Sequence, residues 1–259
     1  MISCGIGRGI ALALLAGFVL PATATALSGR DVVVQMKEAR ERGSDQKSVF
    51  RMVLVTKRGD TVSRTLVSYR KKFGADSKSL MFFREPADVA RTGVLVWSYA
   101  GRDDDQWLYL PDLGRVRQIN AGSRGESFMG TDFSYADLGD IDVDERTHDL
   151  VGEEEMDGQP TYKVESVPKK SDVYSKVVTW VSRETFLPVR IDYYDPAGVL
   201  LKTGHFREVR VVKNIPTPFA LKMQNVQTGH QTEMSVLEID YNLGLDDQLF
   251  TERYLKRGP

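Results

Sequence analysis

The sequence contains almost no cysteine, since Cys4 is the only one in 259 residues. Cys4 lies inside an N-terminal stretch with the features of an export signal, so the mature chain is expected to carry no thiol. This absence excludes a disulfide framework, a zinc-thiolate site and cysteine catalysis. Beyond the N-terminal stretch, the sequence also lacks any apolar run long enough to span a bilayer as a helix.

The N-terminal stretch has the parts of a cleavable signal peptide. Arg8 precedes an uncharged apolar run from Ile10 to Leu20, and the small residues up to Ala26 follow. An apolar run of about 11 residues is too short for a membrane anchor, which needs roughly 20. A lipoprotein signal would carry a cysteine where Phe18 stands, so no lipid anchor is expected. We therefore predict export, cleavage after Ala26 and a single mature domain over residues 27–259.

The sequence has no excess of either charge, with 35 Lys and Arg against 36 Asp and Glu. Without Arg8, the mature chain has 34 basic and 36 acidic residues, a net charge of −2. Both signs are interspersed along the chain. This balance gives no general electrostatic attraction to nucleic acid or to an anionic membrane surface.

The mature sequence also lacks the common motifs of catalysis and cofactor binding, such as a Gly-x-Ser-x-Gly elbow or a phosphate-binding loop. The three histidines lie in separate predicted elements, without the spacing of a zinc site: His148, His205 and His230. Residues Asp140–Asp144 begin like a calcium loop, but Glu145 and Val151 stand where that loop needs glycine and glutamate. We expect neither an enzyme nor a metal- or cofactor-binding protein.

One amphipathic helix of about 12 residues is predicted near the start of the mature chain. Ser28 can cap it, and Gly43 lies where it should stop. Apolar residues recur at helical spacing between these signals: Val32, Val33, Met36 and Ala39. This stripe should pack against the rest of the fold.

After this helix the hydrophobic period changes to two, which is typical of strands. The alternation begins at Phe50, and a turn at Arg58–Asp60 leads into a second strand over Thr61–Arg70, so a β-hairpin is expected. Further runs of the same kind follow, separated by short turns rich in Gly, Asp and Pro. About ten to twelve strands without a βαβ repeat predict a mainly β fold, a strongly curved antiparallel sheet or open barrel.

The segment from Gly114 to Leu138 interrupts this pattern with a glycine-punctuated loop that carries large apolar side chains. The loop side chains that must bury are Phe128, Met129, Phe133 and Tyr135. Two interpretations are open. The loop is either a plug that closes one end of the sheet or a mobile lid over a ligand cavity.

Several strands carry large side chains at alternate positions, which places them on shared faces. Trp97 shares a face with Tyr99, and Trp107 with Tyr109; Leu221 and Met223 share another with Phe219. A closed core and a ligand-binding surface both explain such residues.

Several blocks of the sequence resemble the LolA-like family of outer membrane lipoprotein-sorting proteins, over roughly Asp31 to Leu255. The blocks are Met81–Pro86, Gly93–Trp97, Trp107–Pro111, Gly114–Arg117 and Ser127–Leu138. The resemblance implies an incomplete β-barrel whose concave side is covered by helices and a loop, with an apolar cavity for acyl chains. It also implies a soluble periplasmic carrier of lipid or lipoprotein, in transient contact with an inner-membrane exporter of the resistance-nodulation-division (RND) type.

Under this interpretation, the helix over Val32–Arg40 and the loop over Phe128–Tyr135 are the candidates for a movement that releases the ligand. The residues expected to line the cavity or its lid are Phe50, Met52, Leu54, Phe82, Trp97, Trp107, Tyr109, Phe128, Met129, Phe133, Tyr135, Trp180, Leu221 and Met223. The alternative is a non-transporting scaffold or adaptor of the cell envelope, which would need no cavity.

Overall fold

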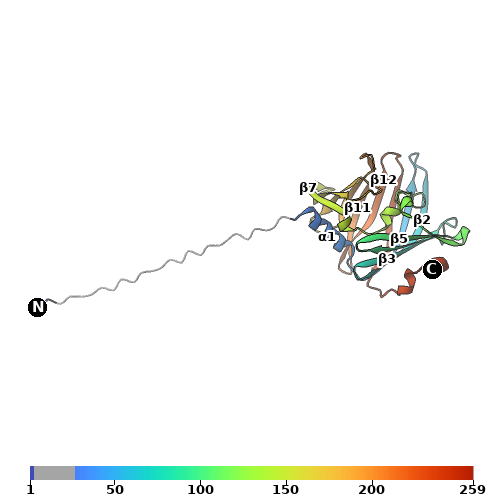
Figure 1. Ribbon diagram of the computed structural model, residues 1–259, viewed down its shortest axis with the longest axis horizontal. Helices are drawn as coiled ribbons and strands as arrows, with labels where there is room; N and C mark the ends of the chain where they lie inside the picture. The colour runs from blue at the N-terminus through green and yellow to red at the C-terminus, as the bar shows by residue number, and fades with distance from the viewer. Residues whose placement is uncertain (3–26, 259) are drawn as a thin grey trace.

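The computed structural model describes residues 1–2 and 27–258 (Figure 1). The apolar run and the cleavage point of the predicted signal peptide, at Ala26, lie outside the described residues. In the described part, neither α-helix has the length and the apolar character needed to cross a membrane.

Thirteen strands form one antiparallel sheet, one strand more than the upper end of the prediction. The strands are β1 (Asp45–Val55), β2 (Thr61–Phe73), β3 (Asp76–Glu85), β4 (Gly93–Tyr99), β5 (Arg102–Leu110), β6 (Arg115–Gln118), β7 (Arg146–Met156), β8 (Gln159–Pro168), β9 (Lys176–Ser182), β10 (Pro188–Tyr194), β11 (Leu200–Val212), β12 (Ile215–Asn225) and β13 (Gln231–Tyr241). Figure 1 shows these strands arranged as a curved sheet rather than a flat one.

The order of the strands leaves the sheet open. Strands that are consecutive in the chain are paired, with the exception of β6 and β7, and the first strand β1 pairs with the last strand β13. As a result β6 and β7 form the two edges of the sheet. The chain must therefore cross from one edge to the other, and residues 119–145 make this edge-to-edge connection.

Tight turns with positive φ angles join the paired strands, as the short connectors predicted. Asp157 and Gly158 have φ angles of 50° and 78° between β7 and β8, and Lys213 and Asn214 have 48° and 65° between β11 and β12. Two successive residues in the left-handed region match the right-handed twist of a hairpin. This turn chemistry explains why the sheet is antiparallel.

The predicted helix is α1 (Gly29–Arg40). The Ser28 side chain accepts from the Asp31 backbone, and the Asp31 side chain accepts from the Ser28 backbone, which completes a capping box. Val32, Val33 and Met36 are buried, and they pack with residues of β8 and β9 such as Val164 and Val181. Helix α1 therefore covers the sheet near the β7 edge, where Figure 1 shows it.

The two faces of the sheet are covered by different segments. The inner face, defined here as the face toward α1 and the edge-to-edge connection, holds an apolar cluster that includes Leu66, Phe83 and Phe128. The outer face of β3 to β6 is covered by the C-terminal segment, which consists of the 3₁₀ helix η5 (Asp247–Phe250) and helix α2 (Glu252–Arg257). Its core cluster includes Phe82.

Candidate ligand-binding site

A cavity of about 230 Å³ lies on the inner face. Helix α1 forms one wall with Val33 and Met36, and strands β9 and β10 contribute Val177 and Ile191. Residues in 136–145 of the edge-to-edge connection, Arg146 at the start of β7 and the first half of β5 also border the cavity. The cavity thus has apolar side chains contributed both by the sheet and by a separate helix that covers it.

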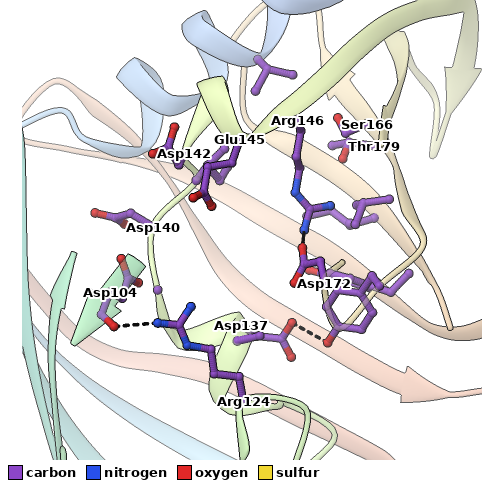
Figure 2. Close-up of a pocket in the computed structure, with 18 of the residues that line it drawn as sticks. Asp104, Arg124, Asp137, Asp140, Asp142, Glu145, Arg146, Ser166, Asp172 and Thr179 are labelled. Atoms are coloured by element: carbon purple, nitrogen blue, oxygen red, sulfur yellow. Dashed lines mark hydrogen bonds and ion pairs between the residues drawn. The ribbon is translucent and has the colours of Figure 1, made fainter. Parts of the chain in front are cut away.

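Charged side chains surround these apolar walls. Figure 2 shows Asp104, Asp140 and Glu145 along one side of the cavity and an Arg146–Asp172 ion pair on the other. Arg124 reaches across from the connection, where its Nη2 donates to the backbone oxygen of Asp104 at 2.7 Å. Such a lining suits an amphiphile that buries its apolar groups and places its polar end against the charged side chains.

The pKa values of two neighbouring carboxylates of this lining are shifted in opposite directions. Burial raises the pKa of the Asp104 carboxyl to about 6, and the nearby Asp140 adds to this rise, while a hydrogen bond from Ser98 opposes it. Burial would also raise the pKa of Asp140, but Arg70 outweighs it and lowers that pKa. The Arg70 guanidinium donates to both carboxylate oxygens, at 2.5 and 2.7 Å. Asp140 is therefore a charged anchor, whereas Asp104 titrates near neutral pH.

A buried polar cluster fixes the connection beside the cavity. The Lys202 ammonium, on the inner face of β11, lies 2.5 Å from a carboxylate oxygen of Asp137. Both side chains are about 95% buried, and the Tyr174 hydroxyl donates to the other Asp137 oxygen at 2.9 Å. Burial, followed by the charge of Asp137, raises the pKa of Tyr174 far above its ordinary range. A buried charge pair with this many partners holds the connection in one position.

The earlier part of the connection is a plug rather than a lid. Phe128 is 2% exposed and packs in the inner apolar cluster together with Tyr135. The Arg64 guanidinium donates to the backbone oxygen of Met129 at 2.6 Å, and the Gln106 amide donates to that of Tyr135 at 3.1 Å. Of the two interpretations left open by the sequence, the structure favours the plug. The cover of the cavity is instead α1 with residues 136–146.

The fourteen residues expected to line the cavity do not come together. Nine lie on the inner face or in the plug: Phe50, Met52, Leu54, Phe128, Met129, Phe133, Tyr135, Leu221 and Met223. Five lie on the outer face: Phe82, Trp97, Trp107, Tyr109 and Trp180. The first four of these five pack around the C-terminal segment, where the Trp97 indole donates to the backbone oxygen of Phe250 at 3.0 Å. The fourteen residues are therefore divided between two faces of the sheet, and none of them borders the cavity described above. Their role in ligand binding stays a prediction.

The physical reason is the alternation of side chains along a strand, which separates adjacent aromatic residues. Phe83 belongs to the inner cluster, whereas Phe82 belongs to the outer one. Trp180 likewise lies between Thr179, which lines the cavity, and Val181, which contacts the α1 cluster, so it points to the outer face. Size and aromaticity do not report which face a residue occupies. The apolar stripe at helical spacing, which includes Val33 and Met36, was the feature of the sequence whose residues do line the cavity.

Within the described residues, those considered for metal binding have other partners, except His205, whose buried Nδ1 has no hydrogen-bond partner. His148 contacts the Ser166 hydroxyl at 2.7 Å and the Val143 backbone oxygen at 2.9 Å, and burial lowers its pKa. His230 pairs with Asp132, and His205 lies on a different strand. In the calcium-like segment Asp140 binds Arg70, Asp142 accepts from the Gly101 backbone, and Asp144 pairs with Arg30. Within residues 27–258, no group of three or more metal-ligating side chains is placed to hold an ion.

Comparisons with known proteins give consistent matches. A family model described as "uncharacterized protein" matches residues 75–257. A DUF1329 family protein from Desulfovibrio piger is 36% identical, with a TM-score of 0.84 and coverage of 88% of this chain and 97% of that one. An outer membrane lipoprotein-sorting protein domain from Vibrio parahaemolyticus is 29% identical, with a TM-score of 0.84 and coverage of 88% and 98%. A comparison with curated proteins finds no match.

A LolA superfamily protein from Nitrosomonas europaea shares the fold at 18% identity, with a TM-score of 0.71 and coverage of 88% of this chain and all of that one. An open, curved antiparallel sheet whose inner face is covered by a helix and an edge-to-edge connection defines the class of LolA-like half-barrels. The chain belongs to the DUF1329 family. Its fold is LolA-like, as the blocks around Met81–Pro86 and Ser127–Leu138 predicted.

Proposed function

We propose that this protein is a periplasmic carrier that binds lipid, or the acyl chains of lipoproteins, and moves them between the inner and outer membranes. The observation that carries the proposal is the cavity between α1 and the inner face, lined by apolar side chains from two separate elements and by charged side chains around them. Family membership supports the same function, because one relative is described as a lipoprotein-sorting domain. A carrier of this kind performs no catalytic step.

The energetics of such a carrier need only burial and release. Each acyl CH₂ removed from water contributes about 0.8 kcal/mol, so a few methylene groups give useful affinity. A longer chain needs more room than a cavity of about 230 Å³ offers, and α1 is the element whose movement would supply it. Helix α1 contacts mainly β7, β8 and the 3₁₀ helix η4 (Val143–Glu145), so it can move without unpairing any strand. As the partner that loads the carrier, we propose an inner-membrane exporter of the RND type.

Filling the cavity tests the proposal directly. Val177→Trp places an indole among the cavity walls, and we expect it to weaken binding of a dansylated fatty acid at least about tenfold, since it removes the space for the chain. Val211→Trp is the matched control, because Val211 is 70% exposed on β11 and away from the cavity. Fluorescence titration measures both affinities. Equal affinity of the wild-type protein and the Val177→Trp variant would count against the cavity as the binding site.

A second candidate function is a non-transporting envelope scaffold. One observation favours it: the plug with Phe128 and Tyr135 already fills the apolar part of the inner face. A scaffold would bind neither the fatty-acid probe nor co-purifying lipid, and the Val177→Trp substitution would leave its partner binding unchanged. The same titration therefore separates the two functions.

A further inference from the structure

Unpaired basic side chains gather around helix α2 on the outer face of the sheet. The five exposed residues are Arg84 at the end of β3, Arg91 in the following loop, and Arg253, Lys256 and Arg257 on α2. Among residues 27–258, each of the nineteen ion pairs joins other side chains, so none of these five has a carboxylate oxygen within 4 Å of its charged group. Their charges are available to a partner.

The fold brings these residues together from segments more than 150 positions apart in the chain. Leu255 is fully buried on the outer face, and the Tyr254 ring lies 6.4 Å from that of Phe82, which fixes α2 on the sheet. The Arg91 guanidinium donates to the backbone oxygen of Arg257 at 3.3 Å. The Arg257 guanidinium in turn lies 4.8 Å from the centre of the Tyr254 ring. Arg91 and Arg257 therefore lie beside the half-buried Tyr254, and Arg253 and Lys256 belong to the same short helix.

The charge of this surface differs from that of the whole chain. Residues 84–91 and 252–257 together hold five basic and three acidic residues, a net charge of +2, whereas the mature chain has a net charge of −2. The sequence shows only interspersed charges, because Arg84 and Arg91 are remote in the chain from α2. The folded protein has a local basic surface that the overall charge does not reveal.

We propose that this α2 surface, formed by Arg84, Arg91, Arg253, Lys256 and Arg257, binds the anionic phospholipid surface of a membrane. Guanidinium and ammonium groups pair with lipid phosphates, and a half-buried tyrosine such as Tyr254 suits the boundary between headgroups and acyl chains. Nucleic acid is the other polyanion that such a surface fits, but it is not found where an exported chain works. The α2 surface lies on the face opposite the cavity, so docking through it leaves α1 free.

Co-sedimentation with vesicles tests the proposal. The wild-type chain is expected to bind vesicles of phosphatidylglycerol and phosphatidylethanolamine at low salt and to lose this binding at high salt. It should not bind vesicles of pure phosphatidylcholine. The triple variant Arg253→Glu/Lys256→Glu/Arg257→Glu should weaken the partition coefficient at least about 30-fold, since each basic residue near an anionic surface adds several-fold to binding.

The matched control is Lys57→Glu/Arg58→Glu/Lys170→Glu, which changes the net charge by the same amount at exposed positions far in sequence from α2. It should retain binding within about threefold. If the triple glutamate variant does not fold, Arg253→Gln/Lys256→Gln/Arg257→Gln replaces it. We expect its partition coefficient to lie between those of the wild-type chain and the triple glutamate variant. Equal losses in the α2 and control triples overturn the proposal. Absence of wild-type binding to the anionic vesicles also overturns it.

Discussion

At the scale of single residues, the main feature is a pair of partly buried carboxylates, of which only one has a basic side chain paired with its negative charge. Asp140 has the Arg70 guanidinium on both of its oxygens, so its negative charge stabilises the fold. Asp104 has a Ser98 hydroxyl and the backbone as partners, and burial disfavours its charge. One carboxylate therefore anchors the connection, whereas the other makes the site sensitive to pH.

The Asp104→Asn substitution tests this difference. Because the folded-state pKa of Asp104, about 6, lies above its unfolded value, its contribution to stability falls as the pH rises from about 4 to 6. An amide cannot ionise, so Asp104→Asn should raise the free energy of unfolding by about 1–3 kcal/mol at pH above 7, with a gain that shrinks toward pH 4. Urea denaturation across this range measures the effect. A variant less stable than wild type above pH 7 would contradict the assignment.

At the scale of secondary-structure elements, the docking of α1 depends on a glycine. A Cβ atom on Gly29 would lie 2.5 Å from the His148 oxygen and 2.6 Å from the Leu150 nitrogen, both backbone atoms of β7. Backbone atoms in a paired strand cannot move aside easily. The close approach of α1 to the edge strand therefore requires glycine at this position.

The Gly29→Ala substitution separates helix propensity from docking. Alanine is the better helix former by about 1 kcal/mol in a helix interior, but the clash with β7 should destabilise the protein by about 1–3 kcal/mol. Hydrogen exchange should then rise selectively in α1, as the helix leaves the sheet. Gln35→Ala, on the exposed side of α1, serves as the control and should be nearly neutral. Unchanged stability and exchange in Gly29→Ala would show that docking does not depend on this contact.

Most elements could be predicted from the sequence, because period, caps and turns are local signals. The start of β12 shows the limit: the alternation points to Phe219, whereas the strand begins at Ile215. Prolines at 216 and 218 argue against a strand, yet both pair with β11, while pairing with β13 begins only at Ala220. The prolines thus occupy a stretch with a free side, where a missing N–H is tolerated.

The site was less predictable, because it depends on which face each strand residue occupies. Strand β13 carries one extra residue, Leu237, opposite the step from Val49 to Phe50 in β1, so alternation along β13 cannot be extended through this bulge. The charged lining also comes from distant segments: Asp104, Arg124 and Asp172 lie on β5, the edge-to-edge connection and the turn after β8. No local pattern marks such residues as neighbours.

At the scale of the whole molecule, the inner face is divided between a plug and a cavity. The plug occupies the half next to β1 through β5, and the cavity occupies the half under α1. This division leaves α1 as the gate of the proposed carrier and the opposite face, with its α2 surface, as the side that meets a membrane. The curved open sheet can then stay rigid while ligand enters or leaves.

The measurement that tests the carrier function most directly is native mass spectrometry of the protein purified from the periplasm of a host that exports it. We predict a population with bound phospholipid or acylated peptide, and a matched loss of this population in the Val177→Trp variant. Wild-type protein that shows only the mass of the polypeptide, with no lipid in its organic extract, would contradict the account.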